Sequence, residues 1–234
     1  RLNYYAVTAM LARVYCWAGE YGNAYKEAKE VVDATYSTGS TSTASCFNFS
    51  NSLTTNRKDY NSIIMTFFKS TCYEDYLPYM TKGNDVVLVV NTTNLFGDEA
   101  GADDRNLDLF GDWDGGDIKY SFKYDIKEGT SGTDMIPAIR LSEMYYIMGE
   151  YFAYKDEFSK AGEMLDKVRY ARGISTTNLA SSIGSLEVFH THLIKEMRRE
   201  FVGEGQMFFQ YKRLDQKPKD NVVFVFDKPN NEDI

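Results

Sequence analysis

The chain has 234 residues, of which 43% are hydrophobic and 26% charged, and its formal net charge is −8. This length buries one good core or two small ones, and the composition is typical of a folded domain rather than a disordered one. The longest apolar run, Val86 to Val90, is far below the roughly 18 residues of a membrane helix, and the negative charge without a Lys/Arg cluster argues against nucleic acid as a partner.

The chain begins with two predicted helices, at about residues 3 to 18 and 22 to 35. The Ser/Thr-rich stretch from Ser37 to Thr55 has turn formers and almost no apolar periodicity, so it predicts an exposed loop. Three later segments are β-branched and aromatic, or alternate in polarity, and we expect them to pair as a small sheet. They are Ser62 to Phe68, Asp85 to Asn91 and Ile118 to Tyr124.

The helical pattern returns at Pro137 and runs to about Tyr154. We place the start of this helix at Pro137 because proline suits the first turn of a helix. A further helix is expected from Phe158 to Arg172, where Gly173 ends it. The rest is expected to be mostly helical as far as Lys212. The sequence thus predicts one domain made of a helical hairpin (1–36), an insert of loops and short strands (37–136), helical repeats (137–214) and an extended tail (215–234).

The two helical regions resemble each other when residues 4 to 32 are read against 141 to 169 without a gap. The bulky positions correspond, as do the turn and the small residues of the second helix. Leu11 pairs with Met148, Tyr15 with Phe152, Glu20 with Glu157, Tyr21 with Phe158, Ala24 with Ala161, Ala28 with Leu165 and Val31 with Val168. This placing resembles tetratricopeptide units, in which a small residue lets two helices approach closely. We therefore predict a mainly α, tetratricopeptide-like αα-hairpin superhelix.

A charged helix and an aromatic helix follow each other between Ile194 and Asp215, joined through Gly203 and Gly205. The charged helix carries Glu196, Arg198, Arg199 and Glu200 between apolar residues at helical spacing. One interpretation is an ordinary solvated charged face. The other is a family signature.

Taken in order, several segments resemble the carboxy-terminal half of the SusD/RagB family. They are Ala12 to Tyr15, Gly19 to Tyr21 with Ala24, Asp104-Arg105, Phe122 to Tyr124, Ile139 to Tyr145, Ala161, Val168-Arg169, Glu196 to Glu200 and Phe208 to Arg213. The last two match an ERRRE-like helix and an FFDLKR-like helix. The sequence departs from the family pattern at Ser142, Met197 and Gln210.

The resemblance implies a cell-surface lipoprotein of the outer membrane of Bacteroidetes-type bacteria. Such a protein captures glycan and hands it to a TonB-dependent transporter, without catalysis or a cofactor, and is tied to the membrane only through a lipid anchor that this chain does not carry. The family's usual length implies an amino-terminal part that lies before Arg1, and the alternative is a naturally short form of the protein. The alternatives are a peptide-binding member of the same family and a protein–protein adaptor built on repeats.

The acidic loop from Gly97 to Asp117 is the first candidate for a ligand site. Sugar rings stack on aromatic faces while carboxylates bind their hydroxyls, so Trp113 between Asp112 and Asp114 suits this role. Tyr76 and Tyr79 are second choices. Calcium is an alternative ligand of the same loop, but Lys123 stands where an EF-hand loop needs its final Glu.

The sequence lacks the main catalytic and metal-binding motifs, and His190 and His192 point to different faces of a helix. Glu143 and Glu150 are a formal pair of acids for glycoside cleavage. We expect them instead to form ion pairs with an Arg such as Arg140 or Arg199. Of the three cysteines, Cys16 is expected to be partly buried, and a disulfide between Cys46 and Cys72 is a hypothesis.

Overall fold

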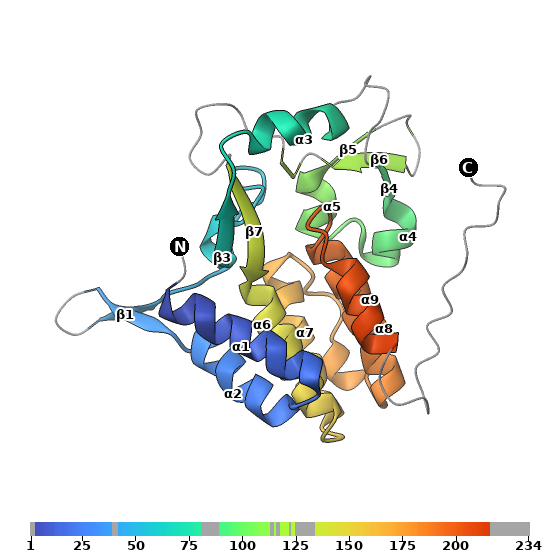
Figure 1. The fold of residues 1–234 in the computed structure, drawn as a ribbon. Coiled ribbons are helices and arrows are strands. Elements are labelled where there is room, and N and C mark those ends of the chain that lie inside the picture. Colours follow the sequence, from blue (N-terminus) through green and yellow to red (C-terminus); the bar gives the residue numbers. More distant parts are fainter. Residues whose placement is uncertain are drawn as a thin grey trace.

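The computed structural model describes residues 3–38, 42–80, 89–112, 115, 118–121, 123–124 and 134–215. Helical hairpins make up the lower part of the molecule in Figure 1, and most strands and short helices of the insert lie above them, while the hairpin of β1 (Thr35–Ser37) projects to the left. Among the described residues, no helix combines the length and the hydropathy needed to cross a membrane.

The first hairpin consists of α1 (Tyr4–Ala18) and α2 (Tyr21–Val32). The Asn3 side chain caps α1 by accepting a hydrogen bond of 2.8 Å from the Ala6 N–H, and Gly19 ends the helix with a φ of 78°. Where the two helices meet, Ala9, Ala12, Ala24 and Ala28 are fully buried, so the backbones approach closely.

The predicted second helix, 22 to 35, was too long at its end. The chain leaves the helix after Val32, because Thr35–Ser37 (β1) pairs antiparallel with Thr43–Ser45 (β2). The stretch from Ser37 to Thr55 is also less exposed than expected. Leu53 is buried, and Phe47 and Phe49 pack against hydrophobic cores, since even isolated apolar side chains gain free energy by leaving water.

The second hairpin consists of α6 (Leu141–Ala153) and α7 (Phe158–Ala171). Its turn repeats that of the first hairpin, because Asp156, opposite Gly19 in the ungapped alignment, also has a positive φ, of 58°. Ala161, Leu165 and Val168 are fully buried, like their counterparts on α2. The predicted repeat is confirmed.

The remaining helices of the body are α8 (Leu186–Glu200), α9 (Met207–Asp215) and the short η3 (Leu179–Ser181). A second hydrophobic core joins α8 to the second hairpin through side chains that include Tyr146, Leu165, Phe189, Leu193 and Phe201. The expected fold class, helical hairpins with an insert of short strands, is confirmed.

The segment from Pro137 to Arg140, expected to begin a helix, belongs instead to strand β7 (Met135–Arg140), and α6 starts at Leu141. β7 pairs antiparallel with β3 (Ile63–Phe68), and Pro137 lies opposite Thr66 beside a shift in register. A proline has no N–H for a regular ladder, but a bulge at an edge tolerates it. Long-range pairing therefore decided what the local helix signal could not.

The three expected strands form two sheets rather than one. β4 (Val89–Asn91), β6 (Ile118–Ser121) and β5 (Phe110–Asp112) form a three-stranded antiparallel sheet in that order, separate from β3 and β7. The first residues of the expected strand at 85–91 lie outside the described residues.

The other elements of the insert are η1 (Tyr60–Ser62), α3 (Cys72–Met80), α4 (Thr92–Phe96), η2 (Gly97–Glu99) and α5 (Asp104–Leu109). Leu53, Leu95, Phe96, Leu109 and Phe110 give the insert a small core of its own. The hypothetical disulfide is wrong, because Cys46 and Cys72 are both free, and Cys16 is more deeply buried than expected. Most of the predicted tail, 216–234, lies outside the described residues.

Candidate functional site

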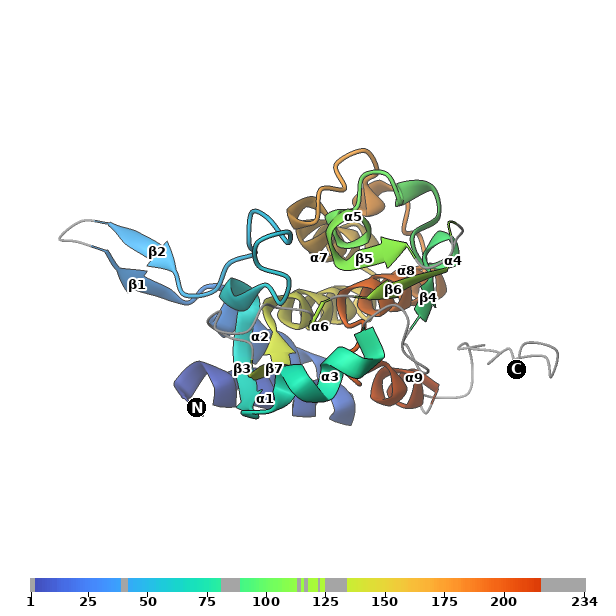
Figure 2. The ribbon, with the colours of Figure 1, turned by 90° about the horizontal axis from the view of Figure 1, so that it is seen from above.

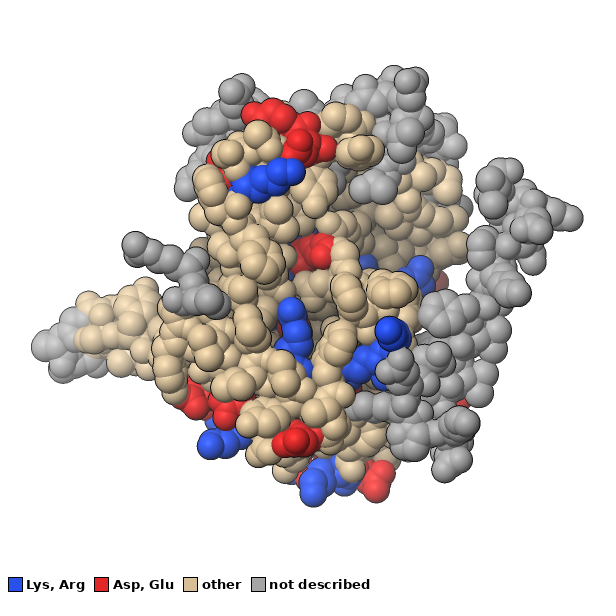
Figure 3. All heavy atoms as spheres, in the orientation of Figure 1, with Lys and Arg blue, Asp and Glu red and all other residues tan. Residues whose placement is uncertain are grey.

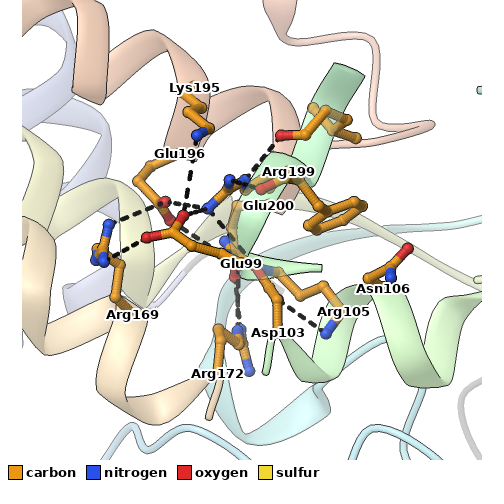
Figure 4. Close-up of polar contacts among 12 residues, drawn as sticks. Glu99, Asp103, Arg105, Asn106, Arg169, Arg172, Lys195, Glu196, Arg199 and Glu200 are labelled. Carbon is orange, nitrogen blue, oxygen red and sulfur yellow. Dashed lines mark hydrogen bonds and ion pairs between the residues drawn. The ribbon is translucent and has the colours of Figure 1, made fainter. Parts of the chain in front are cut away.

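Three of the four charged residues between Glu196 and Glu200 turn into the molecule, and Arg198 alone of the four is exposed, so the interpretation as an ordinary solvated face is wrong for the other three. Glu196, Arg199 and Glu200 are almost fully buried. Figure 4 shows them in one network with side chains of the insert and of α7. Arg199 bonds Glu99 at 2.6 Å and Glu196 at 2.9 Å, and it also donates to the carbonyls of Leu95 and Phe96.

The same network holds the Asp104-Arg105 segment. The buried Arg105 guanidinium donates to both carboxylate oxygens of Asp103, at 2.9 and 2.8 Å, and also reaches Glu196 at 2.9 Å and Glu200 at 3.2 Å. On the far side of Glu200, Arg172 bonds this carboxylate at 2.5 Å and Asp59 at 2.7 Å. Segments from across the chain are thus clamped onto α8.

Two carboxyl groups of the network, Glu99 and Glu200, have a lowered pKa because arginines surround them. Burial opposes the charge of Glu99, but hydrogen bonds from Arg199 and Thr177 outweigh it and lower its pKa to about 2. Burial likewise opposes the charge of Glu200, yet Arg172 and Arg105 hold the pKa of this carboxyl well below its ordinary value. An acid with so low a pKa is a poor proton donor near neutral pH, so Glu99 and Glu200 do not suit the role of a general acid.

The glycine turn between α8 and α9 completes a second buried cluster. Gly203 and Gly205 have φ of 73° and 69°, which directs Glu204 between them into the body. Glu204 accepts hydrogen bonds from Arg140 at 2.7 Å and from Lys123 at 2.5 Å. The signature turn therefore fastens β7, and the segment after β6, to the helical body.

Glu143 and Glu150 form ion pairs, as expected, but with other partners. Arg13 of α1 donates to both oxygens of Glu143, at 2.6 and 2.5 Å, and Arg213 of α9 binds Glu150. The predicted partners are engaged elsewhere, because Arg140 bonds Glu204 and Arg199 bonds Glu99 and Glu196. Both acids are occupied in joining helices.

Of the predicted loop site, Asp112 is described. It lies exposed at the end of β5, and its Oδ1 accepts a hydrogen bond of 2.8 Å from the Gly115 N–H. Trp113 and Asp114 lie outside the described residues. In the part of the chain that the structure describes, no group of three or more His, Cys, Asp or Glu could hold a metal. Since the acidic loop is only partly described, calcium at this loop stays untested.

The two tyrosines of α3 differ in their surroundings. Tyr76 stacks on the buried Tyr124 with ring centroids 4.6 Å apart, and burial raises the pKa of Tyr76. It thus anchors α3 to the body, whereas Tyr79 is 46% exposed. Figure 2 shows α3 on the side of α1 and α9, and β5 on the side of α5 and α7. The helix that carries both tyrosines thus lies apart from β5, the strand that Asp112 ends.

A half-buried aromatic beside Asp112 was missed in the sequence. Tyr120 pairs with Gly111 across the sheet, and a Cβ added to Gly111 would lie 2.5 Å from the Tyr120 Cζ. The ring therefore lies against the glycine, one position along the strand from the pair of Asp112 and Lys119. A glycine within a strand was the available signal, because it marks a close approach.

The fold and the buried networks define a class of protein, a helical-hairpin repeat body onto which an insert of strands and loops is clamped by ion pairs. The model of the SusD family matches residues 12–231, and the chain belongs to this family.

Solved structures share this fold. A SusD superfamily protein from Bacteroides thetaiotaomicron VPI-5482 has 26% identity and a TM-score of 0.66, over 91% of this chain and 50% of that one. Surface glycan-binding protein A from Bacteroides uniformis has 17% identity and a TM-score of 0.66, over 94% and 52%. A SusD-like carbohydrate binding protein from Bacteroides vulgatus ATCC 8482 has 18% identity and a TM-score of 0.60, over 91% and 45%. The chain thus spans about half the length of these relatives. No curated protein matches it.

Proposed function

We propose that this chain is part of a cell-surface glycan-binding protein that captures an oligosaccharide or polysaccharide and delivers it to a TonB-dependent transporter of the outer membrane. Membership of the SusD family over residues 12–231 carries the proposal. Two structures of the same fold are named as a surface glycan-binding protein and a carbohydrate binding protein, which supports a glycan as the ligand. The proposed tie to the membrane is a lipid anchor.

The proposed contacts lie at the acidic loop. Asp112 stands exposed where β5 ends, and Asp114 and Trp113 follow it in sequence. Carboxylates bind sugar hydroxyls, and an aromatic ring stacks on the apolar face of a pyranose. Tyr120 supports the base of this loop from the neighbouring strand, and the buried ion pairs at Asp103 and Arg105 hold the segment that leads into β5. A rigid scaffold under a loop reduces the entropy lost on binding.

Binding in this proposal is noncovalent and involves no turnover. The candidate acids Glu143 and Glu150 are each held by an arginine, which supports a structural role for both. Glycan release on incubation, if abolished by Glu143→Gln or Glu150→Gln, would contradict this part of the proposal. Tyr79 is a secondary candidate contact because it is exposed on α3.

The test is a titration with plant, host and microbial oligosaccharides, followed by tryptophan fluorescence. The chain has two tryptophans, Trp17 and Trp113, so single substitutions separate their signals. We expect saturable quenching by at least one sugar, kept in Trp17→Phe and lost in Trp113→Phe. Isothermal calorimetry on Asp112→Ala, with Asp108→Ala as the matched acidic control on α5, reports whether the affinity falls at the loop. A flat calorimetric response to every sugar would contradict glycan binding by this chain and favour the alternative of a peptide ligand.

A further inference from the structure

A small cavity with a charged wall lies where the insert meets the helical body. Its volume is about 10 Å³, which is room for one water-sized sphere. In Figure 3, basic and acidic side chains reach the surface between the insert and the helices, on a face that is mostly uncharged. Five basic side chains line the cavity, and they are Arg57, Arg105, Lys123, Arg140 and Arg172.

The wall of the cavity carries more positive than negative charge. Against the five basic groups it has two carboxylates, those of Asp59 and Glu200. Four of the five basic side chains are buried, and Arg57 is half-buried. Three further carboxylates form ion pairs with these basic groups, but they are not among the described residues that line the cavity. They are Asp103 and Glu196, which bind Arg105, and Glu204, which binds Lys123 and Arg140.

The two carboxylates of the wall are already engaged. Oδ1 of Asp59 accepts a hydrogen bond of 2.8 Å from the Ser50 N–H, and Oδ2 accepts one of 2.7 Å from Arg172. Glu200 accepts at both oxygens, from Arg172 and from Arg105. A water molecule needs acceptors for its two hydrogens, whereas an anion needs donors alone. The wall therefore favours a ligand that only accepts hydrogen bonds.

Arg172 supplies a donor for such a ligand. Its Nε and Nη2 bond Glu200, and Nη2 also bonds Asp59. Figure 4 shows this arginine beside Glu200 in the network. Nη1 has no hydrogen-bond partner among the described residues, although Arg172 is only 2% exposed. A buried charged donor without a partner loses the hydrogen bonds that it makes in water, so a ligand at Nη1 gains free energy.

We propose that this cavity binds a monatomic anion, chloride, which accepts hydrogen bonds from Arg172 Nη1 and is held by the charges of Arg57 and Arg140. A space of one sphere excludes polyatomic anions such as sulfate and phosphate. Arg57 belongs to the insert, Arg140 ends β7 and Arg172 follows α7. The anion thus joins segments that are far apart in the chain, and the half-buried Arg57 marks its way in.

The first test is the dependence of the melting temperature on chloride. A ligand that binds only the folded chain raises the melting temperature with the logarithm of its concentration, once that concentration exceeds the dissociation constant. Sodium chloride is therefore compared with sodium gluconate at equal ionic strength, which keeps the screening of the ion pairs the same. We expect the rise in chloride and in bromide, and none in gluconate.

A matched pair of substitutions separates the cavity from the general surface charge. Arg57→Gln removes a cation of the wall, and Arg198→Gln removes an exposed cation of α8. The rise with chloride is expected to be several-fold smaller in Arg57→Gln and unchanged in Arg198→Gln. Arg172→Lys, checked for folding by circular dichroism in gluconate, is expected to abolish it. The Arg57 and Arg198 pair decides the result if Arg172→Lys does not fold.

A crystal of the chain soaked in sodium bromide locates the anion by anomalous scattering. We expect a peak within hydrogen-bond distance of Arg172 Nη1. A water molecule in the cavity, without a bromide peak, would overturn the proposal. So would a bromide peak without any chloride effect on the melting temperature, because it would be an adventitious ion only. An equal chloride effect in Arg57→Gln and Arg198→Gln would place the responsible anion elsewhere on the protein.

Discussion

Arg213 holds Glu150 through two parallel hydrogen bonds, each 2.7 Å long, from Nη1 to Oε2 and from Nη2 to Oε1. Both side chains are almost fully buried, and the pair joins α9 to α6. Arg213 is the last residue of the FFDLKR-like segment, whose first two aromatics, Phe208 and Phe209, are exposed. The signature therefore ends on a structural pair rather than on a ligand contact.

Removing Arg213 alone is expected to lower the free energy of unfolding more than replacing Arg213 and Glu150 together by apolar residues. Arg213→Met leaves Glu150 charged and unpaired in the interior, so the free energy of unfolding should fall by about 3–5 kcal/mol. The double variant Arg213→Met, Glu150→Leu removes both charges and should recover most of this loss. Urea unfolding followed by circular dichroism measures both. A single variant as stable as the parent would show that the pair is not buried.

The turn of the first hairpin provides a matched pair of glycine substitutions. Gly19 has a φ of 78° and Gly22 lies in the first turn of α2, while an added Cβ at either position meets no atom within 4 Å. Gly19→Ala should therefore lower the free energy of unfolding by about 1 kcal/mol through backbone strain alone, and Gly22→Ala should raise it by roughly 0.5–1 kcal/mol. Equal effects from thermal unfolding would exclude this explanation.

Alanine is expected to destabilise the protein at Gly162, although it is expected to stabilise it at Gly22. An added Cβ at Gly162 would lie 2.6 Å from the Ala180 backbone, where α7 meets η3. Gly162→Ala should thus lower the free energy of unfolding by about 1–3 kcal/mol, although alanine is the better helix former. Chemical unfolding of the two variants side by side checks the prediction, and a stabilised Gly162→Ala would contradict the close contact.

Acid should weaken the clamp on the insert. The pKa of Glu99 is about 2 in the folded chain, against 4.5 as its ordinary value. Because the unfolded chain takes up a proton first, the stabilisation by Glu99 is complete above about pH 4.5 and is lost as the pH falls towards 2. The melting temperature should therefore drop across this range.

Glu99→Gln is the matched test, because it keeps the shape and removes the titrating group. Its melting temperature should depend less on pH between 4.5 and 2 than that of the parent. Glu200 and Glu204, whose pKa values are lowered in the same direction by neighbouring basic groups, retain part of the dependence. If a calorimetric pH series gave the same dependence of melting temperature on pH for both proteins, Arg199 and Arg169 would not lower the pKa of Glu99 as described.

The predicted ligand site stays a prediction. Asp112 lies exposed at the end of a strand, and Trp113 and Asp114 lie outside the described residues. The role of Tyr76 could not be predicted from the sequence, because no residue near it in the chain indicates that its ring stacks on Tyr124. Tyr120 was missed because its partner Gly111 belongs to another strand.

The sequence by itself determined the helical hairpins. Their signals are local, because a small residue at a helix crossing and a glycine at a helix end act within a few residues. The small residue occurs twice in register, as Ala24 and Ala161. The tertiary structure alone decided the partners. In the sequence, Glu196 and Glu200 are typical of surface charge on a helix. In the structure they bind Arg105 and Arg172, which belong to distant segments. Pro137 predicts a helix start, but in the structure it lies in a strand that pairs with β3. In each case the free energy comes from a contact between segments that the chain order keeps far apart.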